Sequence, residues 1–163
     1  AHAAKLVHIV ASTGSTSEAA AKKLLSPPDQ ALIDMGDFVG GMLKYLRKKP
    51  IPYLTIAGGF GKLTKLAQGK FDLHSSRSQI NMNKLANLIR DIGGSETLFK
   101  AVKNANTGLH VFEMCQNQNL NISNHIAQLA KEVVLASLGV HIKVDILVFG
   151  RSGKLEGRSD KRS

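Results

Sequence analysis

The stretch that decides the fold is Tyr53-Leu-Thr-Ile-Ala-Gly-Gly-Phe-Gly-Lys-Leu-Thr-Lys-Leu-Ala-Gln-Gly69. Its apolar start, residues 53–57, is typical of a buried strand, and residues 62–68 have a helical pattern. Between them, Gly58, Gly59 and Gly61 let the backbone approach a ligand closely, and the helix N-terminus presents free N–H groups. The order strand, glycine turn and helix therefore predicts a cradle for an anionic or nucleotide-like ligand.

Polar and basic residues follow this turn. Lys62 and Lys65 are three residues apart, which places them on one side of the predicted helix. His74 comes next and can carry a proton or contact a ligand near neutral pH. Alternatively, residues 74–77 form a surface loop in which Ser75 or Ser76 caps a later helix, and the residues alone do not decide between the two.

Two similar units precede this one. Residues 5–11 form an apolar strand, and Ser15 and Glu18 have the spacing of a capping box at the start of a helix. Residues 31–35 form the second strand, after which Gly36 and Asp37 begin another helix. Three successive units of strand, loop and helix predict a parallel sheet with helices on its faces.

The three loops would gather at the carboxyl ends of the strands, where such sheets bind ligands. They contain Gly14, the pair Gly36-Asp37, and the turn of residues 58–61. A carboxylate after a second strand often binds a ribose hydroxyl. Asp37 is better explained as an ordinary helix N-cap, although the ligand role stays open.

The rest of the chain is helical and then returns to strand. Residues 82–138 have helical periodicity, with Ser95 as a helix cap, and residues 142–148 alternate as a strand does. A short last strand is predicted at residues 154–157. We therefore expect an α/β fold, Rossmann-like, with a mostly parallel sheet, flanking helices and a helical segment before the last strand. Residues 1–158 would form one domain and residues 159–163 a basic tail.

Composition limits the function classes. The 163 residues carry 22 basic and 12 acidic side chains, a net charge of +10 that should attract polyanions. A nucleic-acid-binding module is one possibility, but an aromatic content of 5% without Trp is poor for base stacking. The single Cys115 excludes an intrachain disulfide and we expect it to serve in packing; we assign no metal site. No apolar run approaches the ~20 residues of a membrane span, so we expect a cytoplasmic protein.

Several runs of the sequence resemble the cobalt-precorrin-5B (C1)-methyltransferases, the CbiD family. The most specific is Gly-Lys-Leu-x-Lys-Leu-Ala-x-Gly at residues 61–69, followed by His74-Ser75. The resemblance covers nearly the whole chain but only the C-terminal part of a family member. A strand that begins almost at residue one likewise leads us to expect part of a longer protein. If the active site lies between the two parts, this chain alone would be inactive.

The resemblance implies S-adenosylmethionine-dependent methylation of ring carbon 1 of a cobalt-containing tetrapyrrole, in the oxygen-independent route to cobalamin. His74 becomes the candidate catalytic residue, as a proton acceptor or a contact to the substrate. Two further groups of residues are assigned on this basis. Those expected to bind the cofactor are Gly14, Asp37, Gly58, Gly59 and Gly61, and those expected to bind the substrate carboxylates are Lys62, Lys65, Ser75 and Arg77.

Two questions stay open at this point. The Gly14 loop and the turn of residues 58–61 compete for the cofactor. The chain also departs from the family pattern at Gly59, where the family tends to have His, and at Leu73, where a polar residue is typical.

Overall fold

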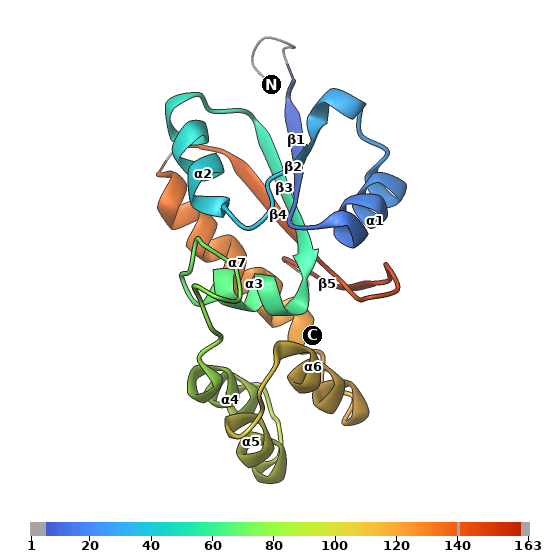
Figure 1. The fold of residues 1–163 in the computed structure, drawn as a ribbon, viewed down its shortest axis with the longest axis vertical. Helices are drawn as coiled ribbons and strands as arrows, with labels where there is room; N and C mark the ends of the chain where they lie inside the picture. The colour runs from blue at the N-terminus through green and yellow to red at the C-terminus, as the bar shows by residue number, and fades with distance from the viewer. Residues whose placement is uncertain (1–5, 140, 161–163) are drawn as a thin grey trace.

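The computed structural model describes residues 6–139 and 141–160, and these form an α/β domain built on a five-stranded sheet (Figure 1). The strands stand in the order β2-β1-β3-β4-β5, the first four parallel and β5 antiparallel to β4. The α/β fold and the mostly parallel sheet are therefore confirmed. The strands are β1 His8–Ser12, β2 Leu32–Asp34, β3 Tyr53–Gly59, β4 Lys143–Phe149 and β5 Leu155–Arg158.

Helices cover both faces of the sheet. On one face lies α1, over the small cluster that includes Val10, Ala57 and Leu147. On the other face α2, α3 and α7 pack against the larger core, in which Ile9, Leu54 and Ile56 are buried (Figure 1). The bounds of these helices are α1 Ser15–Leu25, α2 Val39–Lys48, α3 Phe60–Ala67 and α7 Ile122–Leu138.

Three further helices lie beyond the carboxyl ends of the parallel strands, at the bottom of Figure 1. Together we call them the helical extension: α4 Met82–Asp91, α5 Glu96–Lys103 and α6 Gly108–Asn117. The predicted cap of α5 is confirmed, since Ser95 Oγ accepts a hydrogen bond from the N–H of Leu98. The predicted helical segment between β3 and the end of the sheet is thus confirmed.

Two predicted helix caps are wrong. The capping box at Ser15 and Glu18 does not form, because the N-cap of α1 is Gly14, without a side-chain hydrogen bond. Asp37 does not cap α2, whose N-cap is Phe38. Both α1 and α2 begin directly after a loop at the carboxyl edge of the sheet. The conformation of that loop, and not the local capping pattern, sets the positions of Ser15 and Asp37.

Cys115 and the first two residues of the predicted tail, Ser159 and Asp160, contact the rest of the domain. The Cys115 side chain is buried, and burial raises the pKa of its thiol to about 11, which fits the predicted packing role. Ser159 is also buried, and its hydroxyl donates to Asp145 Oδ1 at 2.8 Å. Lys131 pairs with Asp160 at 2.7 Å. Residues 159–160 therefore pack on the domain, and residues 161–163 of the predicted tail lie outside the described residues.

Candidate functional site

The first and third loops at the carboxyl edge are packed against each other. The N–H of Thr13 donates to the carbonyl of Ala57 at 3.0 Å. A Cβ atom on Gly58 would lie 2.8 Å from Thr13 Oγ1 and 3.2 Å from Leu63 Cγ. Glycine at position 58 is therefore what allows the two loops to meet.

These loops open onto a cavity of about 820 Å³. Gly14 and Gly59, the N-caps of α1 and α3, both have extended backbone and both line it. A Cβ atom at Gly14, Gly59 or Gly61 would meet no other atom within 4 Å, so the backbone here is open to a ligand. The lining residues come from four parts of the chain, of which α6 forms one wall. They are residues 13–17, residues 59–62, residues 148–152 together with Glu156, and the α6 residues Leu109, Phe112, Glu113 and Gln116.

The wall formed by α6 is held by contacts to the start of α3. A Cβ on Gly108 would lie 3.0 Å from Gly61 Cα, so these backbones approach closely. The rings of Phe60 and Phe112 lie with centroids 5.5 Å apart. The helical extension therefore contributes a partly aromatic wall to a cavity whose floor is the edge of the sheet.

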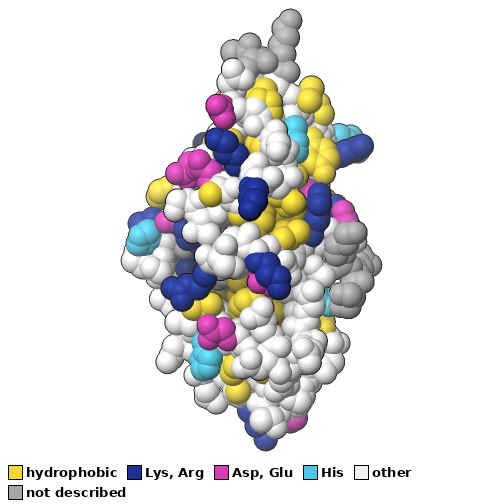
Figure 2. All heavy atoms as spheres, turned by 90° about the vertical axis from the view of Figure 1, so that its right-hand side faces the viewer, with side chains coloured by type: hydrophobic (Ala, Val, Ile, Leu, Met, Phe, Trp, Pro, Cys, Tyr) yellow, Lys and Arg dark blue, Asp and Glu magenta, His cyan; other side chains and the backbone are white. Residues whose placement is uncertain are grey.

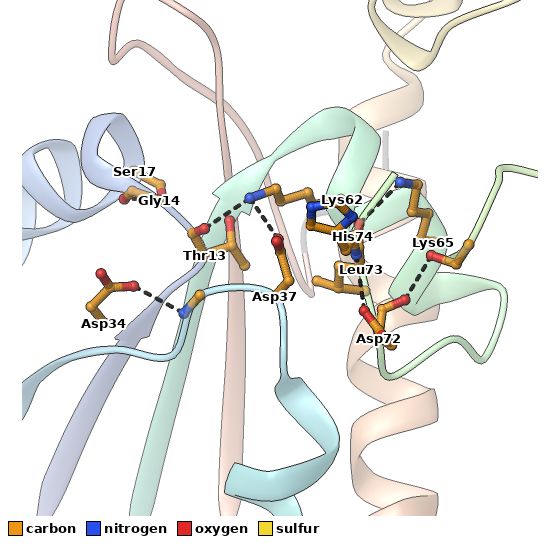
Figure 3. A network of polar contacts seen from close by, with 12 residues as sticks. Thr13, Gly14, Ser17, Asp34, Asp37, Lys62, Lys65, Asp72, Leu73 and His74 are labelled. Carbon is orange, nitrogen blue, oxygen red and sulfur yellow. Dashed lines mark hydrogen bonds and ion pairs between the residues drawn. The ribbon is translucent and has the colours of Figure 1, made fainter. Parts of the chain in front are cut away.

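Lys62 lines the cavity and joins the first and second loops (Figure 3). Its Nζ atom donates to the carbonyl of Thr13 at 3.0 Å and lies 2.8 Å from the buried Oδ1 atom of Asp37. Asp37 is not among the residues that line the cavity. Its carboxylate holds Lys62 in place.

Lys65 has a different environment from Lys62, although the two are three residues apart. Its side chain is buried, and its Nζ atom donates to the carbonyl of Leu73 at 3.0 Å (Figure 3). Burial lowers the pKa of Lys65, while the nearby Asp37 opposes that shift. Lys65 thus anchors the segment that carries His74.

His74, Ser75 and Arg77 lie in an exposed loop that does not line the cavity. The Nδ1 atom of His74 accepts a hydrogen bond from the N–H of Ser76 at 3.1 Å. Arg77 pairs with Asp72, and this hydrogen bond is the main reason that the pKa of Asp72 is lowered. The loop is tied to the second loop, since the N–H of Leu73 donates to the carbonyl of Asp37 at 2.9 Å.

The predicted site residues therefore divide into two groups. Gly14, Gly59, Gly61 and Lys62 line one cavity, so both glycine loops that compete for the cofactor belong to it. The lining does not include Asp37, Gly58, Lys65, His74, Ser75 and Arg77.

Sequence reasoning missed the lining residues on α6 and on the turn between β4 and β5. Phe112, Glu113, Arg151 and Glu156 lie far along the chain from the glycine loops. The available signal was indirect: the Gly150-Arg-Ser-Gly153 turn follows a strand that, in a parallel sheet, ends at the same edge.

Residues 6–139 and 141–160 contain neither a metal cluster nor a membrane-spanning helix. No group of three or more His, Cys, Asp or Glu side chains there is placed to hold a metal ion. Within the same residues, no helix has the length and apolar character needed to span a bilayer.

Sheet topology and cavity together define an α/β protein with a ligand-sized site at the carboxyl edge of a parallel sheet. Residues 72–160 match the family model described as "CbiD, C-terminal domain". The chain belongs to the CbiD family, as the resemblance indicated.

Curated relatives agree with this assignment. The chain is 50% identical over 159 residues to the cobalt-precorrin-5B C(1)-methyltransferase of Brucella anthropi, covering 97% of this chain and 43% of that protein. It is 49% identical over 156 residues to the protein of the same name from Methylorubrum extorquens, covering 95% of this chain and 43% of the relative. The chain thus spans less than half the length of these relatives. No solved structure matches it significantly.

Proposed function

We propose that this chain binds the methyl donor in an S-adenosylmethionine-dependent methyltransferase that acts on C1 of cobalt-precorrin-5B in cobalamin biosynthesis. The reaction is taken from the names of the relatives. The observation that supports a donor site here is the cavity of about 820 Å³ between the two glycine loops. Pockets of roughly 300–1,000 Å³ are usual for small ligands and cofactors.

The groups in the cavity suit a nucleoside with an amino acid end. The half-buried Phe112 ring, packed against the buried Phe60 ring, offers a surface for a flat base, and the open backbone at Gly14, Gly59 and Gly61 permits close approach. The N-termini of α1 and α3 suit a carboxylate because their N–H groups are partly positive. Strand order also supports the proposal, because the direction of chain progression reverses between β1 and β3, where Rossmann-like sheets bind nucleotides.

The substrate carries several acetate and propionate groups, so it needs cations outside the donor site. Arg151 lies exposed at the rim of the cavity, and Arg77 and His74 lie on the neighbouring exposed loop. We propose that these three face the tetrapyrrole, with His74 as a proton acceptor or a contact to its periphery. Lys62 and Lys65 act differently: their ammonium groups hold the loops together.

Methyl transfer from a sulfonium donor needs positioning more than acid–base chemistry. The donor supplies an activated methyl group and leaves as S-adenosylhomocysteine. The residues of this chain hold the donor against the edge of the sheet, and Lys62, fixed by Asp37 and the Thr13 carbonyl, keeps the two nearest loops at a constant separation. Orientation of this kind can lower a barrier by about 7–11 kcal/mol.

A calorimetric titration with S-adenosylhomocysteine tests the donor site. Gly14→Val and Gly61→Val fill the cavity, and the first atom each adds meets no protein atom within 4 Å. We expect saturable binding by the wild type and at least a tenfold loss in either variant. Gly41→Val is the matched control, because Gly41 is equally open but lies on α2, away from the cavity.

The outcomes separate the possible errors. Loss in only one of the two variants would restrict the donor to that loop. Binding that survives both substitutions would remove the donor from this cavity. If the folded wild type does not bind, the same titration of the longer Brucella anthropi relative decides between a site that needs the rest of that protein and a wrong assignment of the donor.

A further inference from the structure

A β-bulge places Glu156 out of register between β4 and β5. Val148 pairs with Gly157 and Phe149 pairs with Leu155, so Glu156 stands between two paired residues without a partner on β4. Bulges of this kind bend the strand and re-aim a side chain, and they are frequent beside active sites. This bulge lies at the carboxyl end of β4, where the cavity opens.

The Glu156 side chain folds over the turn and into the cavity lining. A Cβ atom on Gly150 would lie 3.0 Å from Glu156 Oε1 and 3.3 Å from its Cγ. Glycine at position 150 therefore leaves the space that the carboxylate occupies. The side chain is half-buried, and among the described residues its carboxylate has no hydrogen bond or ion pair within the chain.

The other carboxylates near this edge are engaged or more exposed. Asp34 Oδ1 accepts a hydrogen bond from the N–H of Gly36 at 2.9 Å. Asp37 is paired with Lys62, and Glu113 on α6 lines the cavity but is exposed. Neither Asp34 nor Asp37 lines the cavity, so a carboxylate after the second strand does not reach this site, whereas Glu156 in β5 does.

We propose that Glu156 binds the vicinal hydroxyl pair of a ribose in this cavity; this inference rests on the proposed donor site. An ionised carboxylate is an acceptor with two oxygens, which matches two neighbouring O–H donors. The charges of Lys62 and Arg151 in the lining are balanced by those of Glu113 and Glu156, so net charge does not choose between ligands. An ammonium group is therefore the competing partner of Glu156, and a ligand that has the ribose but no ammonium group separates the two.

Three ligands separate the ribose from the amino acid end. S-adenosylhomocysteine has both the ribose and the amino acid end. 5′-Methylthioadenosine keeps the intact ribose but lacks the amino acid end, and 2′-deoxy-5′-methylthioadenosine additionally lacks the 2′-hydroxyl group of the ribose. We expect Glu156→Gln to weaken the first two by a similar factor, about tenfold or more, as expected for a hydrogen bond to a charged group. The deoxy ligand should bind the wild type weakly, and Glu156→Gln should weaken it little further.

Two more variants serve as controls. Glu132→Gln should change affinity less than twofold, because Glu132 is exposed on α7 and does not line the cavity. Gly150→Ala should weaken binding of 5′-methylthioadenosine while Glu156 is retained, because the added methyl displaces the carboxylate. Thermal unfolding of each variant, compared with the wild type, shows that a loss of affinity is not a loss of fold.

Several results would overturn the proposal. Unchanged affinity of a folded Glu156→Gln variant would remove this residue while leaving the donor site intact. A loss for S-adenosylhomocysteine but not for 5′-methylthioadenosine would assign Glu156 to the ammonium group instead. If neither the folded wild-type chain nor the longer Brucella anthropi relative binds any of the three ligands, the donor site and this inference are overturned together.

Discussion

Gly58 lies where the two glycine loops meet, and the space around it differs from the space around its neighbour Gly59. A Cβ at position 58 would meet Thr13 Oγ1 at 2.8 Å, whereas a Cβ at Gly59 would meet nothing within 4 Å. We expect Gly58→Ala to reduce the free energy of unfolding by about 1–3 kcal/mol, as overpacking of a buried site does.

Gly59→Ala is the matched control for this prediction. Gly59 is the N-cap of α3, and we expect its replacement to cost less than about 1 kcal/mol. Urea denaturation of the two variants measures both values. Equal losses would mean that backbone conformation, and not the contact with Thr13, explains the glycine at position 58.

Single residues were also where sequence reasoning was weakest. Lys62 and Lys65 were predicted to share one side of a helix and one role, yet Lys65 is buried against the Leu73 carbonyl while Lys62 lines the cavity. Asp37 has the local signal of a helix cap but is held by Lys62, 25 positions away. Spacing along a helix does not reveal such partners, because they come from other loops.

At the scale of the elements, Arg158 and Ser159 attach β5 to the centre of the sheet. Arg158 donates through Nε at 2.9 Å and through its Nη2 atom at 2.6 Å to Oδ2 of Asp145, which is only 6% exposed. The hydrogen bond to Asp145 raises the pKa of Arg158. This pair compensates for a carboxylate buried in the middle of β4.

We expect Arg158→Ala to reduce the free energy of unfolding by about 2 kcal/mol, because it leaves the buried carboxylate of Asp145 without its cation. The loss should be smaller than for a fully buried ion pair, because Arg158 is partly exposed to solvent. Arg151→Ala, on the exposed turn beside β5, is the control and should stay within about 0.5 kcal/mol. Chemical denaturation measures both. A similar small loss in the two variants would show that Ser159 alone satisfies Asp145.

The elements themselves could largely be predicted from the sequence. Apolar runs such as residues 53–57 and helix caps such as Ser95 are local signals, and the structure has a strand and a helix at those places. The succession of three strand–loop–helix units also allowed the parallel sheet to be predicted. The helical extension was predicted as helix but not in its position, because nothing local indicates that α6 turns back to reach Gly61.

For the whole molecule, His8 should make stability depend on pH. Its Nε2 atom lies 2.8 Å from Thr55 Oγ1, and burial lowers the pKa of His8, an effect that Asp145 opposes. Below the ordinary histidine pKa of about 6.5, the unfolded chain binds a proton that the folded chain resists, so stability falls as pH falls.

Urea denaturation at pH 7.5 and at pH 5.5 measures this effect. We expect the wild type to be less stable at the lower pH, and His8→Asn to lose part of that difference. Asp72 is not involved in this range, since its pKa is lowered from an already acidic value. An unchanged pH dependence in the variant would assign the effect to other histidines.

The candidate site is assembled from distant parts of the chain, which is why only its two glycine loops were predicted. Its lining extends from Thr13 to Glu156 and draws on four separate parts of the chain. The glycine loops could be found because strand ends meet at one edge of a parallel sheet. Glu156 depends on a bulge, and a bulge has no reliable local pattern. The net charge likewise did not indicate where an anionic ligand binds. Lys and Arg side chains are dispersed among acidic ones over the face shown in Figure 2.

The helical extension lies in the chain between β3 and β4, so it lengthens the segment that joins these two paired strands. β1 and β3 pair with a separation of 45 residues between His8 and Tyr53, and β3 and β4 pair with a separation of 90 between Tyr53 and Lys143. Doubling a closed loop adds only about 0.6 kcal/mol of entropy cost. Insertions in the loops that join α4, α5 and α6 should therefore add little to the entropy cost of pairing β3 with β4. The pairing should nevertheless form slowly during folding, because its two strands are far apart along the chain.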